Sequence, residues 1–427
     1  MPEELARRLG TTDAVVVGLS AMIGAGVFAA FAPAAGAAGA WLPLALALAA
    51  VVAYCNATSS ARLAARHPES GGTYVYGRRR LTPLWGYLAG WGFTVGKTAS
   101  CAAMALTFGA YVAPGAARPL AIGAVAALTL LNLFGVQRSA GVARAIVVFV
   151  LAVLLAVVVA GLTGDTEVTL GWSFGRPASE PFLYPPFTAD GVDAWGVLQG
   201  AGLLFFAFAG YARIATLGEE VRDPARTIPR AVGIALGVTL VVYALVAATA
   251  LHVLGPVLLA RSPAPLADLV REAGAGWLAP VVGAGAAVAA LGALLALLLG
   301  VSRTMLAMAR ERDLPAALAL VDPVRQVPRR AELAVGGAVI VLLLVADLRG
   351  AIGFSSFGVL VYYAIANACA LTLGRDEGAP PKPVPIAGLG LCLVLAATLP
   401  LSSVLAGLAV FAIGLLLWAL RHHRPRR

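Results

Sequence analysis

The sequence predicts an all-α polytopic membrane protein with twelve transmembrane helices. Of its 427 residues, 60% are hydrophobic and only 12% are charged, about half the charged share of a soluble domain. The mean hydropathy is +0.89, and the apolar residues form runs long enough to cross roughly 30 Å of hydrocarbon. Because backbone polar groups in lipid need partners within their own segment, these runs are expected to be helices.

Twelve runs come close to the length of about 20 residues that a membrane-spanning helix needs. They cover residues 13–33, 40–62, 84–113, 118–135, 143–163, 193–217, 231–254, 277–302, 333–347, 351–373, 384–400 and 403–420.

The basic residues predict the orientation. With the N-terminus inside, the inner segments hold 24 of the 31 basic residues, the outer loops hold five, and the spans hold Lys97 and Arg213. This bias predicts a multi-pass protein of the plasma membrane with both termini cytoplasmic. The net charge of +10 is explained by these topology-determining clusters, so we expect no nucleic-acid partner.

The acidic residues fall in loops or at helix ends, and none lies in the middle of a span. Asp13, Glu332 and Asp347 lie at span edges. A site inside this membrane is therefore expected to use backbone groups, hydroxyls, aromatic rings and the two buried cations. We expect no metal, no cofactor and no catalytic residue, because an enzyme site needs paired His, Asp, Glu or Cys side chains in the spans.

Glycines interrupt two of the predicted spans. Gly24 and Gly26 lie within the first span, and Gly210 lies within the sixth. Unwinding there exposes backbone N–H groups that can hold a carboxylate, and carbonyls that can hold an ammonium group. An amino acid carries both groups, although close helix packing would also explain these glycines.

The two interruptions fall at matching places, which favours an inverted repeat of spans 1–5 and 6–10 with two C-terminal helices appended. The chain then divides into a cytoplasmic N-terminus (1–12), a first repeat (13–163), an extracellular loop (164–192), a second repeat (193–373), spans eleven and twelve (374–420) and a cytoplasmic tail (421–427).

Several segments resemble a known family. The run SAMIGAGVF at 20–28 is similar to the first-helix signature of the amino acid–polyamine–organocation superfamily of permeases. FAFAGY at 206–211, EEVRDP at 219–224 and SRTMLAMAR at 302–310 resemble their sixth helix, the loop after it and the stretch after the eighth helix. The resemblance extends from residue 10 to about residue 320, and it implies a leucine-transporter-type fold.

The resemblance also implies a binding site. The backbone N–H groups of Ala25, Gly26 and Val27 would hold a substrate carboxylate. The implied ammonium-binding carbonyls are those near Ser20, Ile23, Phe206, Ala207 and Ala209. Gly24, Phe208 and Gly210 complete the predicted substrate-binding set, and the aromatic residues Phe206 and Tyr211 would form the gate.

Lys97 lies well inside the third span, roughly 20 Å along the helix axis from residue 84. An ionisable group at this depth is a candidate for proton coupling, and the alternative is a structural donor to helix-end carbonyls. Some members of the family carry a lysine in the fifth span in place of a sodium ion. Here Val150 falls near that place, so Lys97 is our candidate for the coupling residue.

These features favour a permease that moves a neutral L-amino acid by alternating access, linked to protons. Independence of sodium is expected because span eight has no hydroxyl between Ala279 and Val301. Transport of a cationic amino acid or polyamine, and amino acid exchange, remain alternatives. The expected partners are the amino acid, protons and the lipid bilayer, with no obligatory protein partner. Arg213 is expected to reach the interface or to pair with Glu219 or Glu220, which is a structural role. The alternative is that it faces the pocket, where it would disfavour cationic substrates.

Overall fold

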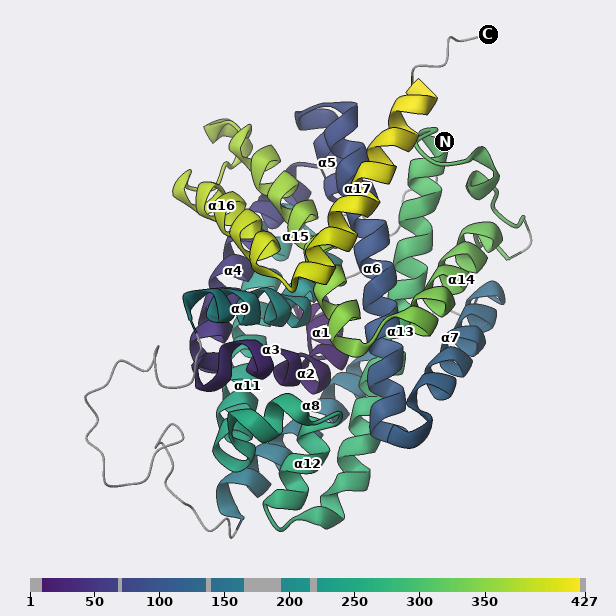
Figure 1. Cartoon of the computed structure of the whole chain (residues 1–427). Helices are drawn as coiled ribbons and strands as arrows, with labels where there is room; N and C mark the ends of the chain where they lie inside the picture. The colour runs from purple at the N-terminus through teal and green to yellow at the C-terminus, as the bar shows by residue number, and fades with distance from the viewer. Residues whose placement is uncertain are drawn as a thin grey trace.

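A computed structural model describes residues 10–67, 71–135, 140–164, 193–215, 221–323 and 325–422. These residues form a bundle of helices (Figure 1). Those that precede residue 165 are α1 Thr11–Met22, α2 Ala25–Ala29, α3 Phe31–Ala38, α4 Leu42–Arg66, α5 Thr73–Arg80, α6 Pro83–Val112, α7 Ala117–Leu133 and α8 Ala140–Thr163. Those that follow residue 192 are α9 Ala194–Phe208, α10 Ala212–Ala215, α11 Pro224–Arg261, α12 Pro265–Glu272, α13 Ala279–Arg310, α14 Arg329–Val345, α15 Leu348–Leu371, α16 Pro383–Thr398 and α17 Leu401–His422.

Nine helical segments of the described chain are long and apolar enough to cross a membrane. The three other predicted spans correspond to α6, α14 and α16. The 30-residue α6 is long but less apolar, whereas α14 has 17 residues and α16 has 16. A multi-pass membrane protein is therefore the fold class, and the number twelve stays a prediction.

The sequence placed the end of the seventh span at residue 254, and a break in α11 follows directly. Gly255 has φ 65° and ψ 170°, outside the helical region, and Pro256 follows it. Glycine tolerates this positive φ because it has no Cβ. The short α12 follows α11 and packs against α8, α11 and α13 in the lower part of the bundle (Figure 1).

The helices α6 and α13 form the centre of the bundle. α6 packs against α13 and α15, and α4 packs against α9 and α11. α1 lies against α8 and α11, while α7 lies against α14. The broken first span, α1 and α2, is therefore enclosed by helices from both halves of the chain.

Ion pairs hold one end of the bundle together, at the upper end in Figure 1, where α5 and the end of α17 lie. Arg80 of α5 donates to Glu377 at 2.5 and 2.9 Å. These hydrogen bonds lower the pKa of Glu377 to about 2. Arg78 pairs with Asp313 at 2.9 Å, and Arg421 of α17 donates to the Asp313 carbonyl. These three arginines, all assigned to inner segments from the sequence, thus share one end.

Candidate functional site

The first span breaks where its glycines predict. Helix α1 ends at Met22, and Ile23 leaves the helical region with φ −83° and ψ 52°. Gly24 follows with φ −104° and ψ −141°, and α2 begins at Ala25. Ala30 keeps helical dihedral angles between α2 and α3, so α2 is the start of a longer helical segment. The N–H groups of its first turn have no partner within the helix.

The sixth span changes its winding at the corresponding place. Helix α9 ends at Phe208, the residues Ala209–Tyr211 form a 3₁₀ turn, and α10 follows. A 3₁₀ turn is tighter than an open loop but also interrupts the α-helical hydrogen bonding. The interruption is therefore more compact than the one between α1 and α2.

The two interruptions lie directly against each other. A Cβ atom added to Gly26 would lie 2.7 Å from Ala207 Cα. A Cβ added to Gly210 would collide with the backbone carbonyl of Ala21. Both glycines are thus required for close approach of backbone to backbone.

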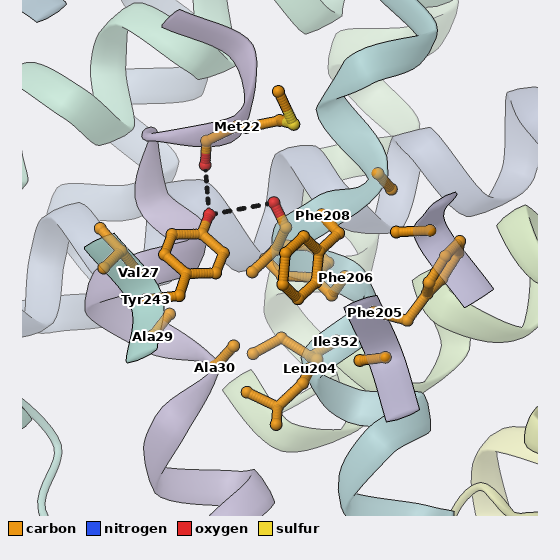
Figure 2. Close-up of a cluster of buried hydrophobic side chains, with 14 of the residues drawn as sticks. Met22, Val27, Ala29, Ala30, Leu204, Phe205, Phe206, Phe208, Tyr243 and Ile352 are labelled. Carbon is orange, nitrogen blue, oxygen red and sulfur yellow. Dashed lines mark hydrogen bonds between the residues drawn. The ribbon is translucent and has the colours of Figure 1, made fainter. Parts of the chain in front are cut away.

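A tyrosine that the sequence analysis missed joins the two interruptions. The hydroxyl of Tyr243, on α11, donates to the carbonyl of Met22 at 2.5 Å and lies 3.1 Å from the carbonyl of Ala207 (Figure 2). One carbonyl belongs to the end of α1 and the other to α9. The single hydroxyl proton is shared between the two carbonyl oxygens. Neither carbonyl therefore receives a full hydrogen bond, and a stronger donor can replace the hydroxyl.

The Tyr243 ring packs among other aromatic rings. It lies edge-on to Phe31 and to Phe208, with centroid distances of 6.1 and 5.1 Å. From the sequence pattern alone, a tyrosine within an apolar helix would be assigned to the packed core. Only the position of Met22 and Ala207 opposite its hydroxyl reveals the connection, and no sequence signal could have found it.

Lys97 reaches the interruption of the sixth span from α6. Its side chain is 7% exposed, and its Nζ lies 3.4 Å from the carbonyl oxygen of Ala209. Ala209 follows the last residue of α9. The lysine therefore lies beside one of the carbonyls assigned to the ammonium group, as a donor to a helix-end carbonyl.

The predicted binding residues come together around these breaks. Those buried from solvent are Ile23, Gly24, Ala25, Gly26, Val27, Phe206, Ala207, Phe208 and Ala209. Ser20 and Gly210 are half-buried, and the Ser20 hydroxyl donates to the carbonyl of Val17 rather than toward the breaks. Tyr211 is fully buried against the ring of Tyr363, with centroids 5.1 Å apart.

The burial of one acidic residue was not predicted from the sequence. Glu332 lies at a helix end as predicted, in the first turn of α14, but it is fully buried and hydrogen-bonded to Ser302 of α13 at 2.6 Å. The sequence could not show this, because helices distant in the sequence cover that end. A carboxylate at a helix end is thus buried inside the protein, which its position at a span edge did not predict.

Other predicted features lie partly outside the described residues. Arg213 is exposed, and its expected partners Glu219 and Glu220 fall outside the described residues. Of the loop 164–192, only Gly164 is described. In the described ranges, no group of three His, Cys, Asp or Glu side chains could hold a metal ion. A cavity of about 420 Å³ is lined by residues that include Tyr111 and Arg271, and none of its lining residues belongs to the predicted binding set.

The chain belongs to the amino acid permease family, whose model matches residues 9–426. It is similar to an uncharacterized transporter of Mycobacterium tuberculosis, with 64% identity over 100% of this chain and 94% of the relative. It is also similar to a branched-chain amino acid permease of Bacillus subtilis, with 26% identity over 98% of this chain and 93% of the relative. A vacuolar cationic amino acid transporter of Arabidopsis thaliana is 27% identical over 90% of this chain and 66% of its own length.

Proposed function

We propose that this permease is a secondary active transporter that carries a neutral L-amino acid across the plasma membrane, linked to protons and independent of sodium. The observation that supports it most is the contact between two interrupted helices, α1–α2 and α9. Their backbone groups have opposite polarity, and both sets are buried. A zwitterion is the ligand whose two charges match such a pair of surfaces.

The proposed cradle divides the substrate between the two helices. The N–H groups of Ala25, Gly26 and Val27 hold the carboxylate, assisted by the positive end of the helix dipole. The carbonyls of Ala207 and Ala209 receive the ammonium group. An ammonium is a stronger donor than the shared hydroxyl of Tyr243, so substrate binding replaces a weak bridge between the helices by a strong one.

The gating follows from how closely the helices pack. Because Gly26 and Gly210 press on the opposite backbone, the amino acid enters only when the two helices separate. Phe206 and Tyr211 are the proposed gate, since both flank the interruption of the sixth span. Movement of one side of the contact relative to the other would expose the cradle to one face of the membrane at a time.

The helix contacts support the proposed inverted repeat. If α1–α2, α4, α6 and α8 correspond to α9, α11, α13 and α15, the contact of α1 with α11 matches that of α9 with α4. Likewise, the contact of α6 with α15 matches that of α13 with α8. All four contacts are present, as expected for two related sets of five helices.

A neutral substrate suits the charges near the cradle. Lys97 lies beside the cradle, with its Nζ 3.4 Å from the Ala209 carbonyl, so it adds a positive charge where a cationic side chain would need a negative partner. The buried carboxylates Asp313 and Glu332 have partners elsewhere, on α5, α7 and α13. Buried apolar side chains, among them Phe206, Phe208 and Ile352, pack beside the cradle (Figure 2). Several relatives are named as cationic amino acid transporters, so a cationic amino acid is the second candidate for the substrate.

Sodium independence is consistent with the position of Ser302. It is the first hydroxyl of α13 after Ala279, and it donates to Glu332 and to the Leu299 carbonyl. It is therefore engaged away from the first span. A sodium site between α13 and α1 would have carbonyls alone, which give the ion poor coordination.

Competition for uptake into proteoliposomes tests the substrate. We expect unlabelled alanine, serine or leucine to reduce the uptake of a labelled neutral amino acid, and arginine and lysine to leave it unchanged. Competition by arginine and lysine alone would assign the chain to the cationic class.

Replacement of Lys97 by Ala tests the coupling. We expect Lys97→Ala to lower the pH dependence of transport while it changes the substrate Kd by less than about threefold, because the lysine donates to only one carbonyl of the cradle. Lys97→Met keeps the length of the side chain without the charge and controls for packing. A pH profile equal to that of the unmodified protein would show that Lys97 is structural.

A further inference from the structure

Glu332 has surroundings that suit a change of protonation. Its side chain is fully buried. Its Oε1 accepts from the Ser302 hydroxyl at 2.6 Å, and its Oε2 accepts from the Asn132 amide at 3.4 Å. Both donors are neutral. Burial of a carboxylate is costly without a cation close by, and among the described residues no cation lies within ion-pair distance of Glu332.

Asp313 provides the contrast. It is buried almost as deeply, but it accepts from Arg78 at 2.9 Å and from the Tyr74 hydroxyl at 2.7 Å. An arginine at this distance stabilises the charged carboxylate. An arginine therefore stabilises the anionic form of Asp313, whereas Glu332 has only neutral hydrogen-bond donors.

Asn132 supplies a second observation. Its Oδ1 atom is buried and has no hydrogen-bond partner. A protonated Glu332 gains a donor, and a rotation of the Asn132 amide by half a turn would place Oδ1 opposite that donor. The asparagine can thus serve either state of the carboxyl group, as donor to the anion or as acceptor from the acid.

Ser302 connects the carboxyl group to the broken first span. Its hydroxyl has two acceptors, Glu332 Oε1 and the Leu299 carbonyl at 3.0 Å. When Glu332 is neutral, Leu299 becomes the stronger competitor for that proton. A serine bonded to its own helix backbone bends the helix. Ala293 lies on the same helix, about 14 Å from Ser302. It packs against Gly24 in the break of the first span, since a Cβ added to Gly24 would lie 3.0 Å from the Ala293 Cβ.

Few charged groups face Glu332 from the helices around it. Arg303 of α13 and Cys101 of α6 lie within electrostatic reach. Helix α7 contributes Asn132, and α14 itself carries Arg329 and Arg330, both exposed. The 3₁₀ turn Ala316–Ala319, which also packs on α14, has no titratable side chain.

We propose that Glu332 is a second proton-binding site of the transporter, separate from Lys97, and that Ser302 transmits its protonation along α13 to the break in the first span. This proposal rests on the proposed transport function. Glu332 binds a proton between its Oε2 and Asn132, and releases it toward the arginine-rich end of α14. The proton changes the bend of α13 and thereby the opening of the cradle.

Amino acid exchange by the full chain in proteoliposomes, with equal pH on both sides, tests this proposal. Equal pH on both sides removes the proton gradient as a driving force. The dependence of the exchange rate on pH then reports the titration of groups in the protein. We expect the exchange rate of the unmodified protein to show an inflection, at which it changes by up to about tenfold per pH unit. Glu332→Gln keeps the shape of the protonated acid, and should reduce the change across this inflection to less than about twofold.

Asp313→Asn is the matched control, since it removes a buried carboxylate that is already paired, and its profile should keep the inflection. Should Glu332→Gln fold poorly, Ser302→Ala retains the carboxyl group, removes its connection to α13 and should also flatten the profile. A profile that keeps its inflection in the folded Glu332→Gln or Ser302→Ala protein, or loses it in Asp313→Asn, overturns the proposal. Absence of all amino acid exchange in the unmodified protein would instead contradict the proposed function.

Discussion

Gly26→Ala is expected to abolish most of the transport activity. The new methyl group would lie 2.7 Å from Ala207 Cα and 2.8 Å from its Cβ, where backbone cannot move aside as a flexible side chain would. Overpacking of this kind costs about 1–3 kcal/mol. If that cost falls on the contact between the two broken helices, the initial rate of uptake falls about five- to 150-fold.

The same substitution at Gly237 is the control. Gly237 lies in α11, and an added Cβ would meet nothing within 4 Å. Alanine favours a helix more than glycine does, so Gly237→Ala should transport normally and unfold at the same or a higher temperature. If Gly26→Ala transports as fast as Gly237→Ala, close approach of the two breaks is not required for function.

Tyr243→Phe is expected to have the second-largest effect. The substitution removes only the hydroxyl, which leaves the carbonyls of Met22 and Ala207 without their donor. A buried group left without its hydrogen bond costs about 1–3 kcal/mol. We expect the substrate-free protein to unfold at a lower temperature, and amino acid exchange to slow about tenfold, the change that corresponds to about 1.4 kcal/mol.

Thr239→Val provides a matched control on the same helix. Thr239 lies one turn before Tyr243, is fully buried, and its hydroxyl has no hydrogen-bond partner in the structure. Its loss should therefore change neither the unfolding temperature nor the exchange rate. Equal effects of the two substitutions would mean that the Tyr243 hydroxyl contributes packing and not a bridge between the helices.

The sequence predicted the features that depend on the local chain. The apolar runs predicted the helices, the glycines at 24 and 26 predicted the break after Met22, and the seventh apolar run predicted an end at residue 254, where the structure has a break at Gly255. Each of these follows from backbone flexibility or hydropathy within a few residues. The 3₁₀ turn at Ala209–Tyr211 was predicted only as an interruption, because its tightness depends on packing against α1.

The features that were missed all depend on contacts between distant helices. Tyr243 and Met22 are 221 residues apart, and Asn132 and Glu332 are 200 residues apart. The sequence placed Glu332 at a span edge, and it is buried there because α6, α7 and α13 surround that end. Periodicity shows which residues are apolar, but it does not show which hydroxyl faces which carbonyl.

The stabilisation of the purified protein by small ligands tests the central claim most directly. Ligands that bind the folded state raise the apparent melting temperature. If the two broken helices hold both ends of a zwitterion, L-alanine or another neutral amino acid raises it, whereas ethylamine and propionate at the same concentration do not. Equal stabilisation by the amine alone or by the carboxylate alone would contradict a cradle built for both charges.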